Sequence, residues 1–373
     1  MLGDHAIPPF RYMDWAKRHT PGPRYNLAKS GAPSLSWEEL AIDPAAMFTK
    51  IRGAYGDDEL KARIAARYGV PVEEVVLTVG SSLAYPLVEM ALLRRDDVVL
   101  VETPCYEVLS TLPELLGAEV RAMNRGEKGT PPWRGHPARG FHLPVERIVD
   151  ALGEGARLVI ASDLHNPTGR GIGEAEILAV AEACEANDAW FLVSEVYRDF
   201  KPGPVGTARA LHPRIVTVSS ATKVYGLGGL RVGWIFAPVE LADRLRRLTD
   251  YFHVENPGPS HAILLQLWHR LDEIRERHRA LGARGWEITR AWIESRDDVD
   301  VVAPDGGMIC FPRIKSRGSA RDLVAKLEAE HETIVVPGME LGLPKHVRIG
   351  FGLDEETLRE GLARLGTVLD QMG

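Results

Sequence analysis

The feature that most constrains this chain is a repeated alternation of short apolar runs with stretches of helical periodicity. The apolar runs, each of strand length, occupy residues 75–79, 98–101, 158–162, 190–194 and 214–218. Helical stretches follow two of these runs, at 83–93 and 174–187. Such alternation indicates βαβ units, in which successive strands run parallel and helices cover the sheet. The sequence therefore predicts an α/β fold.

Length and charge exclude several classes of protein. At 373 residues the chain is long enough for two domains. Its formal net charge is -7 and it contains no polybasic run, which argues against nucleic acid or an anionic membrane surface as a partner. No run is long and apolar enough to span a bilayer, and polar Asp4 and His5 stand where a signal peptide needs apolar residues.

Cysteine usage is sparse. Cys105, Cys184 and Cys310 are too few and too scattered for a disulfide framework or a metal cluster. The sequence therefore predicts a cytoplasmic protein with no metal site.

The most unusual segment follows the run 214–218. It contains Ser219-Ser220-Ala221-Thr222-Lys223, then a Gly-rich turn that leads to Arg231. Open α/β sheets bind ligands at the carboxyl ends of their strands, and a desolvated lysine there is a nucleophile towards a carbonyl group. Ser220 and Arg231 stand on either side of Lys223 and are suited to hold an anion. The alternative is a solvated lysine in a glycine loop.

A second anion site is indicated at Gly80-Ser81-Ser82, between the run 75–79 and the helical stretch 83–93. The free N–H groups and the dipole at a helix N-terminus favour a phosphate. By themselves these residues are also a good helix cap. Pro86 is compatible with the helix if it falls in the first turn.

At these residues the sequence resembles the fold-type I pyridoxal phosphate (PLP) enzymes, specifically the class I/II aminotransferases of the aspartate aminotransferase superfamily. The resemblance runs from about residue 25 to the end. It implies a mostly parallel seven-stranded sheet flanked by helices and a smaller α+β C-terminal domain. The expected division is an N-terminal arm at 1–45, a large PLP-binding domain at 46–260 and a small domain at 261–373.

The resemblance also implies how the cofactor is held. Lys223 would carry PLP as a Schiff base and then act as the general base. Tyr106 would stack on the ring, and Asn166 and Tyr197 would bond its phenolic oxygen. The phosphate-binding set would be Gly80, Ser81, Ser82, Ser220 and Arg231, joined by Tyr55 from the partner subunit of a homodimer with shared active sites. Taken alone, Tyr55 and Tyr106 are equally consistent with packing residues.

The resemblance assigns three residues to the substrate: Gly31, Asn166 and Arg348. The backbone at Gly31 would approach the substrate carboxylate, although a plain turn glycine is the alternative. Arg348 is flanked by apolar residues, and a guanidinium in such a strand needs an anion or a route to water. In the family this arginine binds the substrate α-carboxylate; the alternative is a structural ion pair.

The sequence departs from the family at Ser194, where the usual residue is an aspartate that pairs with the protonated pyridine nitrogen. Either the nitrogen stays unprotonated, or a carboxylate from a neighbouring strand end replaces the aspartate. Asp163 is the candidate for that replacement. Glu195 is less suitable, because alternation along the strand points its side chain to the other face.

Sequence patterns also predict the secondary structure of the remaining segments. Residues 124–142 indicate a surface excursion, and 261–296 a long connecting helix. Further helices are expected at 58–68, 240–249, 320–331 and 354–372, and further strands at 232–236, 299–302, 308–312 and 333–336.

The expected function is a PLP-dependent aminotransferase acting between an L-amino acid and a 2-oxo acid. The alternative is a PLP-dependent lyase, decarboxylase or oxidase, because Ser194 stands in place of the usual aspartate. A nucleotide-binding dehydrogenase is excluded, since Arg231 stands where GxGxxG needs its third glycine and no Walker loop exists. A non-catalytic PLP-binding regulator would need a DNA-binding module ahead of Tyr25, for which the segment is expected to be too short.

Overall fold

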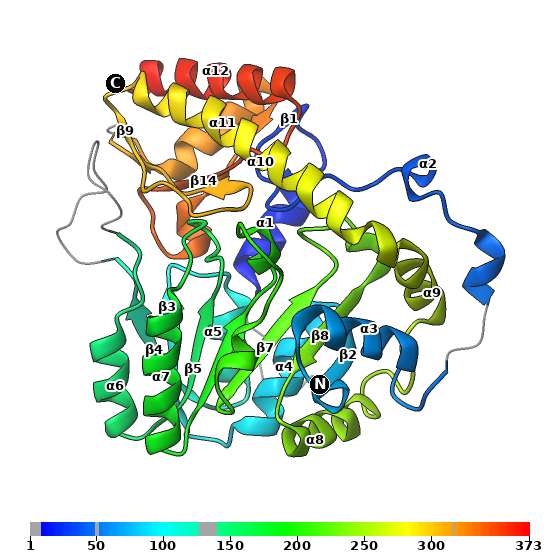
Figure 1. The fold of residues 1–373 in the computed structure, drawn as a ribbon. Coiled ribbons are helices and arrows are strands. Elements are labelled where there is room, and N and C mark those ends of the chain that lie inside the picture. Colours follow the sequence, from blue (N-terminus) through cyan, green and yellow to red (C-terminus); the bar gives the residue numbers. More distant parts are fainter. Residues whose placement is uncertain (1–8, 49–51, 127–139, 316–317) are drawn as a thin grey trace, which may run out of the picture.

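The computed structural model describes residues 9–48, 52–126, 140–315 and 318–373. Its centre is a seven-stranded sheet with the strand order β2-β8-β7-β6-β5-β3-β4 (Figure 1). β8 runs antiparallel to both of its neighbours, and every other neighbouring pair is parallel. The predicted mostly parallel sheet is therefore confirmed. Its strands are β2 (Val75–Val79), β3 (Val98–Thr103), β4 (Glu119–Asn124), β5 (Ala156–Ser162), β6 (Trp190–Ser194), β7 (Ile215–Ser220) and β8 (Val232–Phe236).

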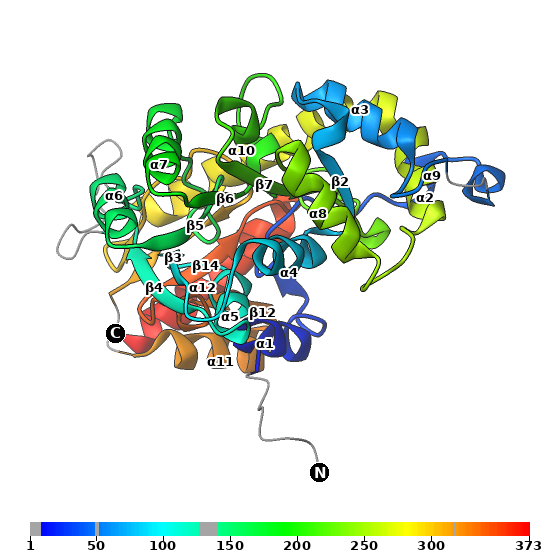
Figure 2. The ribbon, with the colours of Figure 1, turned by 90° about the horizontal axis from the view of Figure 1, so that it is seen from below.

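Helices cover both faces of this sheet because its central strands are apolar on both sides. Val99 and Val101 of β3 pack in a core with Leu241, whereas Leu100, between them, packs in a different core with Ile148. Figure 2 shows α6 and α7 on one side of the sheet and α4 on the other. The covering helices are α3 (Asp58–Tyr68), α4 (Ser81–Leu92), α5 (Val108–Leu115), α6 (Val145–Gly153), α7 (Glu174–Ala186) and α8 (Val239–Thr249).

The helix after β2 differs from the expectation. It begins at Ser81 rather than Leu83, so Pro86 lies beyond the first turn. A proline there has no N–H to donate to the carbonyl four residues earlier. The helix continues because its apolar side chains, including Leu87 and Val88, are fully buried against the sheet.

The remaining strands build smaller sheets that share one core with the helices above them (Figure 1). β14 lies between β10 and β13, β1 pairs in parallel with β12, and β9 pairs with β11. These strands are β1 (Tyr25–Asn26), β9 (Val299–Asp300), β10 (Ile309–Cys310), β11 (Arg313–Ile314), β12 (Thr333–Ile334), β13 (Val336–Pro337) and β14 (Val347–Gly350). The helices are α10 (Leu271–Glu294), α11 (Ala320–His331) and α12 (Glu355–Met372).

Two further differences concern helices. The continuous helix expected at 261–296 is divided into α9 (Gly258–Leu267), a 3-10 turn (Trp268–Arg270) and α10. No glycine or proline stands at this break. The N-terminal arm, for which no helix was predicted, contains α1 (Arg11–His19) and the short α2 (Trp37–Leu40).

Some expectations are not tested by this architecture. Most of the expected surface excursion, residues 127–139, lies outside the described residues. The domain boundaries at 45/46 and 260/261 stay a prediction. Across the described ranges, no helix combines the length and the apolar character needed to cross a bilayer, and no cluster of His, Cys, Asp or Glu side chains could bind a metal ion.

Candidate active site

A cavity of about 320 Å³ lies where the carboxyl ends of the central strands meet the beginning of α4 and one face of α1. This edge is where open α/β sheets bind ligands. Eight of the predicted site residues line the cavity: Ser81, Ser82, Tyr106, Asn166, Ser194, Tyr197, Lys223 and Arg231. The other lining residues are Tyr12, Met13, Ala16, Ser30, Tyr85, Leu109, Ser162, Val196 and Thr222.

Lys223 lies at one wall of this cavity and is held by a serine that sequence reasoning missed. Its Nζ donates to Ser30 Oγ at 3.1 Å, and the Tyr197 hydroxyl donates to the same oxygen at 2.9 Å. Gly31 packs against Lys223 so closely that a Cβ on Gly31 would lie 2.9 Å from Lys223 Cδ. The glycine is therefore needed for this close approach, and a side chain there would displace the lysine.

A second group of residues forms a cradle suited to phosphate. α4 begins after Gly80, which has φ +73° and provides no side-chain cap for the first N–H groups of the helix. The Arg231 guanidinium lies against Gly80, where a Cβ would come within 2.2 Å of Nη2. In the described part of the chain, Arg231 bonds the Gly228 carbonyl at 3.2 Å and pairs with no carboxylate. A guanidinium without a carboxylate partner, beside helix N–H groups that no side chain caps, fits a phosphate dianion.

Ser220 is placed differently from these groups. It is buried, but it is not among the cavity-lining residues, and its Oγ accepts a hydrogen bond from the Thr222 N–H at 3.3 Å. Its assignment to the phosphate stays a prediction.

Arg348, in β14, is fully buried and hydrogen-bonds two cavity-lining residues, Asn166 and Tyr12. It donates to Asn166 Oδ1 at 2.9 Å, to the Tyr12 hydroxyl at 2.8 Å and to the Ala28 carbonyl at 2.9 Å. Within the described ranges no carboxylate pairs with it, so the alternative of a structural ion pair receives no support. Burial raises the pKa of the Tyr12 phenol, but the charges of Arg348 and Lys223 outweigh burial and hold it below its ordinary value.

Tyr106 and Tyr12 form an aromatic wall of the cavity. Their ring centroids lie 5.5 Å apart in an edge-to-face arrangement. This contact fixes the Tyr106 ring beside the cavity, where the family resemblance assigns it to stacking on the cofactor.

At the end of β6, the Ser194 hydroxyl lies 2.6 Å from the hydroxyl of Tyr85, and both side chains are buried. Tyr85 comes from the second turn of α4. The two hydroxyls occupy the part of the cavity where the family has an aspartate.

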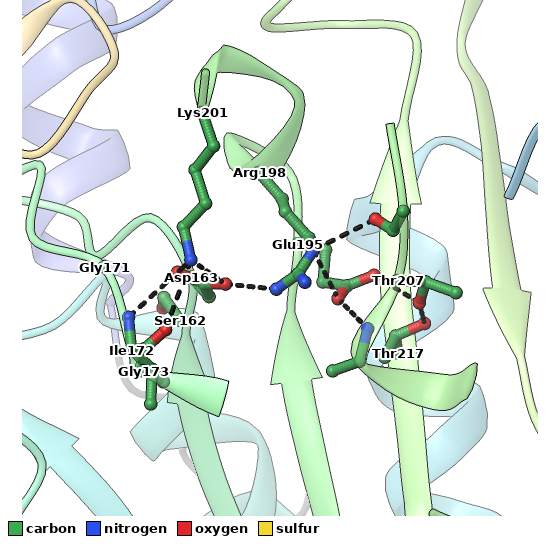
Figure 3. A network of polar contacts seen from close by, with 12 residues as sticks. Ser162, Asp163, Gly171, Ile172, Gly173, Glu195, Arg198, Lys201, Thr207 and Thr217 are labelled. Atoms are coloured by element: carbon green, nitrogen blue, oxygen red, sulfur yellow. Dashed lines mark hydrogen bonds and ion pairs between the residues drawn. The ribbon is translucent and has the colours of Figure 1, made fainter. Parts of the chain in front are cut away.

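Asp163 is not brought to the cavity. Figure 3 shows its carboxylate between Lys201 and Arg198: Lys201 Nζ lies 2.6 Å from Oδ1, and the Ile172 N–H donates to the same oxygen at 3.1 Å. With its charge balanced by these two cations, Asp163 receives no support as the replacement for the missing aspartate. Glu195 points away as expected, since it accepts from the Ala208 N–H and the Thr207 hydroxyl, both at 2.7 Å.

Tyr55 also lies apart from the cavity-lining set. Its hydroxyl donates to Asp250 Oδ2 at 3.4 Å. Its role at the active site of a partner subunit stays a prediction.

Sequence reasoning missed three cavity-lining residues that hydrogen-bond predicted site residues: Tyr12, Ser30 and Tyr85. Ser30 stands next to Gly31, so a glycine that must approach the lysine was the available signal. Tyr12 and Tyr85 lie in helices, and no local pattern distinguishes them from packing residues.

A mostly parallel seven-stranded sheet, with a lysine after β7, a phosphate cradle at α4 and a buried arginine in β14, defines a fold-type I PLP-dependent enzyme. The chain belongs to the aminotransferase class I and II family, whose model matches residues 32–365. PLP is therefore its cofactor, and the cradle beside Lys223 fits that group.

Individual relatives point to more than one reaction. The chain is 30% identical to a capreomycidine synthase of Streptomyces vinaceus, over 98% of this chain and 95% of the relative. It is 28% identical to an arginine–pyruvate transaminase of Pseudomonas aeruginosa, over 83% and 80%. A solved PLP-dependent aminotransferase from Streptococcus suis superposes with a TM-score of 0.89 at 26% identity, covering 98% of this chain and 99% of that one.

Proposed function

We propose that this protein is an aminotransferase that moves an amino group between an L-amino acid and a 2-oxo acid. The family match supports the reaction, and the observation that carries the substrate class is Arg348, a buried guanidinium without a carboxylate partner among the described residues. Leaving a buried cation unpaired is costly, so a substrate that brings a carboxylate completes the site. Both substrates of amino transfer carry that carboxylate.

In the proposed reaction, Arg348 binds the substrate and Lys223 transfers the proton. Arg348 binds and orients the substrate carboxylate, with Tyr12 and Asn166 fixing the guanidinium. When bound, PLP supplies an electrophilic aldehyde and an electron-accepting ring. Lys223 would hold this aldehyde through its amine, and the same amine would remove the proton from the α-carbon of the amino acid and supply one to the α-carbon of the oxo acid. Ser30 holds the Lys223 amine and the Tyr197 hydroxyl on one side of the cavity.

The second candidate is a PLP-dependent reaction other than amino transfer, such as that of a lyase, decarboxylase or oxidase. Two observations favour keeping it: Ser194 replaces the family aspartate, and a relative of nearly full coverage is named a synthase. Arg348 serves an amino-acid substrate in either case.

The experiment that separates the two is a panel of amino acids incubated with the PLP-loaded protein, with and without a 2-oxo acid. Amino transfer requires the oxo acid for turnover and produces one new amino acid for each new oxo acid. Turnover that needs no acceptor, with ammonia, carbon dioxide or a cyclic product released, would contradict amino transfer and support the second candidate.

We further propose that the enzyme is a homodimer with shared active sites. The segment after α8 exposes apolar side chains, with Tyr251 86% and Val254 71% exposed, and Tyr55 contacts Asp250 at the start of that segment. A second copy that covers this surface would bring Tyr55 close to the partner's cavity. A cytoplasmic location is also proposed, because the three cysteines are free thiols.

A further inference from the structure

The pair formed by Ser194 and Tyr85 is a polar group that the proposed reaction does not use. Ser194 ends β6 and Tyr85 belongs to α4, so the contact joins the sheet to the helix that carries the phosphate cradle. The two oxygens lie 2.6 Å apart, and both residues line the cavity. Chemistry at this position is therefore set by two neutral hydroxyls.

No carboxylate is available to replace them among the described residues. The cavity lining contains neither aspartate nor glutamate. Asp163 is held by Lys201 and Arg198, and Glu102 is paired with Arg125 at 2.8 Å. Glu89 lies one turn beyond Tyr85 in α4, but burial raises its pKa well above the ordinary value and so favours the neutral form.

The direction of the Ser194–Tyr85 hydrogen bond follows from its neighbours. Both carboxyl oxygens of Glu89 lack a hydrogen-bond partner, so Tyr85 does not donate to Glu89. A phenol is a stronger donor than an aliphatic hydroxyl, and Ser194 Oγ is the acceptor in reach. The geometry allows either hydroxyl to donate, and on this chemical ground we assign Tyr85 as the donor to Ser194, which leaves the Ser194 proton to point into the cavity.

The positive charges around the cavity also disfavour a proton on the cofactor ring. Lys223 and Arg231 line it, and Arg348 reaches it through Tyr12 and Asn166. The phosphate and the substrate carboxylate balance these cations. A further positive charge on the cofactor ring would have no anion beside it, and an unpaired cation is costly in a buried site.

We propose that Ser194, oriented by Tyr85, donates a hydrogen bond to the ring nitrogen of PLP and so keeps that nitrogen unprotonated at neutral pH. In PLP the nitrogen lies across the ring from the aldehyde carbon, so it faces away from Lys223. The inference rests on PLP occupying this cavity. It makes the ring a weaker electron sink than a pyridinium, which limits how far the enzyme stabilises charge at the substrate α-carbon.

The test is nitrogen NMR of the holoenzyme loaded with PLP that carries a heavy-isotope label at the ring nitrogen. The expected signal is that of a neutral pyridine throughout the neutral pH range. A pyridinium signal in the wild-type protein at neutral pH would overturn the proposal. This measurement needs no turnover and no variant.

Variants then test whether Ser194 and Tyr85 control the protonation state of the ring nitrogen. Ser194→Asp supplies the missing carboxylate and is expected to move the signal to that of a pyridinium; a signal that stays neutral contradicts the role of position 194. Tyr85→Phe and Ser194→Ala are expected to shift the neutral signal by removing the oriented donor. Ser219→Ala is the control, because this serine at the end of the neighbouring strand β7 does not line the cavity and donates to the Glu195 carbonyl at 3.2 Å; it is expected to leave the signal in place.

Asp163→Asn closes the remaining alternative. The proposal expects no change in nitrogen protonation, whereas loss of a pyridinium signal in this variant would make Asp163 the partner and overturn it. Failure here is separable from failure of the proposed function. A loaded protein with a protonated nitrogen that still transfers amino groups contradicts only the inference about Ser194, and a neutral nitrogen without amino transfer contradicts only the proposed reaction.

Discussion

At the scale of single residues, the proposed function depends on two cations, Lys223 and Arg348. Lys223 is held by Ser30 next to Tyr197, and Arg348 is held by Tyr12 and Asn166. The first is placed for covalent chemistry and the second for a carboxylate. Each gives a prediction that a purely structural role would not.

Replacing Lys223 by alanine is expected to reduce turnover roughly a thousandfold or more, because the covalent anchor and the general base are lost together. The visible absorption of the covalently bound cofactor is expected to disappear at the same time. Absorbance and steady-state kinetics measure the two effects. Lys201→Ala serves as a control for a lysine at the same edge of the sheet that does not line the cavity. Persistence of either signal in Lys223→Ala would refute its assignment.

Replacing Tyr12 by phenylalanine removes one of the groups that fix Arg348 and leaves the aromatic wall in place. A hydrogen bond to a charged group contributes about 1.5–3 kcal/mol, so KM for the amino acid is expected to rise roughly ten- to a hundredfold. The value of kcat should change much less, since the bond orients the substrate before and during the reaction. A fall in kcat with KM unchanged would contradict this role.

At the scale of elements, α1 and α4 carry the residues that complete the cavity. α1 brings Tyr12, Met13 and Ala16 to it, although Tyr12 is 336 positions away from Arg348 in sequence. Glu107, just before α5, holds α1 in place, accepting from the Tyr12 N–H at 2.9 Å and from Arg11 Nε at 3.0 Å.

Truncation of Glu107 is therefore expected to loosen α1. Glu107→Ala should lower the free energy of unfolding by about 1–3 kcal/mol, because the Tyr12 N–H loses its acceptor. KM should rise with it, as Tyr12 loses its position. Chemical denaturation and kinetics check the two effects. Glu114→Ala, an exposed glutamate on α5, is the matched control. A stable variant with normal KM would show that Glu107 does not position α1.

Glu89, in α4, is expected to make the protein less stable as the pH rises, because burial raises its pKa. Its folded-state pKa lies well above 4.5 because of burial, and its carboxyl oxygens have no partner. Between about pH 4.5 and that raised pKa, the unfolded chain loses a proton that the folded protein keeps. The contribution of Glu89 to stability is therefore lost as pH rises through this window.

The variant Glu89→Gln cannot lose this proton. The difference in unfolding free energy between Glu89→Gln and wild type is expected to grow in favour of glutamine from about pH 4.5 upwards and then to level off. Denaturation midpoints measured across the range check this. Glu146→Gln, at an exposed position in α6, should show no such trend. A constant difference between Glu89→Gln and wild type would rule out the raised pKa.

At the scale of the whole molecule, the proposed homodimer makes a prediction about mixed subunits. If Tyr55 serves the partner's cofactor, pairing a Lys223→Ala subunit with a Tyr55→Phe subunit creates one site that keeps both wild-type residues. That hybrid is expected to bind PLP covalently with wild-type affinity at half of its sites.

Titration of purified hybrids with PLP, followed by absorbance, measures this affinity. The Tyr55→Phe homodimer is the control and should bind PLP more weakly. A hybrid whose intact lysine binds PLP only as weakly as that control would place Tyr55 in its own subunit's site, and a monomer in solution would contradict the shared site altogether.

The alternation of apolar runs and helical stretches was enough to predict a parallel sheet, whereas its seven strands were implied by the family resemblance and β4 was not predicted. The helices 58–68 and 320–331 were also predicted with the bounds that the structure has. Local pattern did not find α1, whose position depends on contacts with distant residues such as Glu107 and Arg348, nor the break at Trp268–Arg270, where no glycine or proline stands.

The same division applies to the site. Order and spacing along the chain were enough to predict the candidate catalytic lysine, phosphate cradle and carboxylate-binding arginine, because each stands at a strand end, a helix start or within an apolar strand where few residue types are tolerated. Only the tertiary structure decided that Ser30 joins Lys223 to Tyr197, that Asp163 is held by Lys201 and Arg198, and that Tyr85 reaches Ser194. These contacts join elements distant in sequence, and hydrogen-bond partners across such distances depend on how the elements pack.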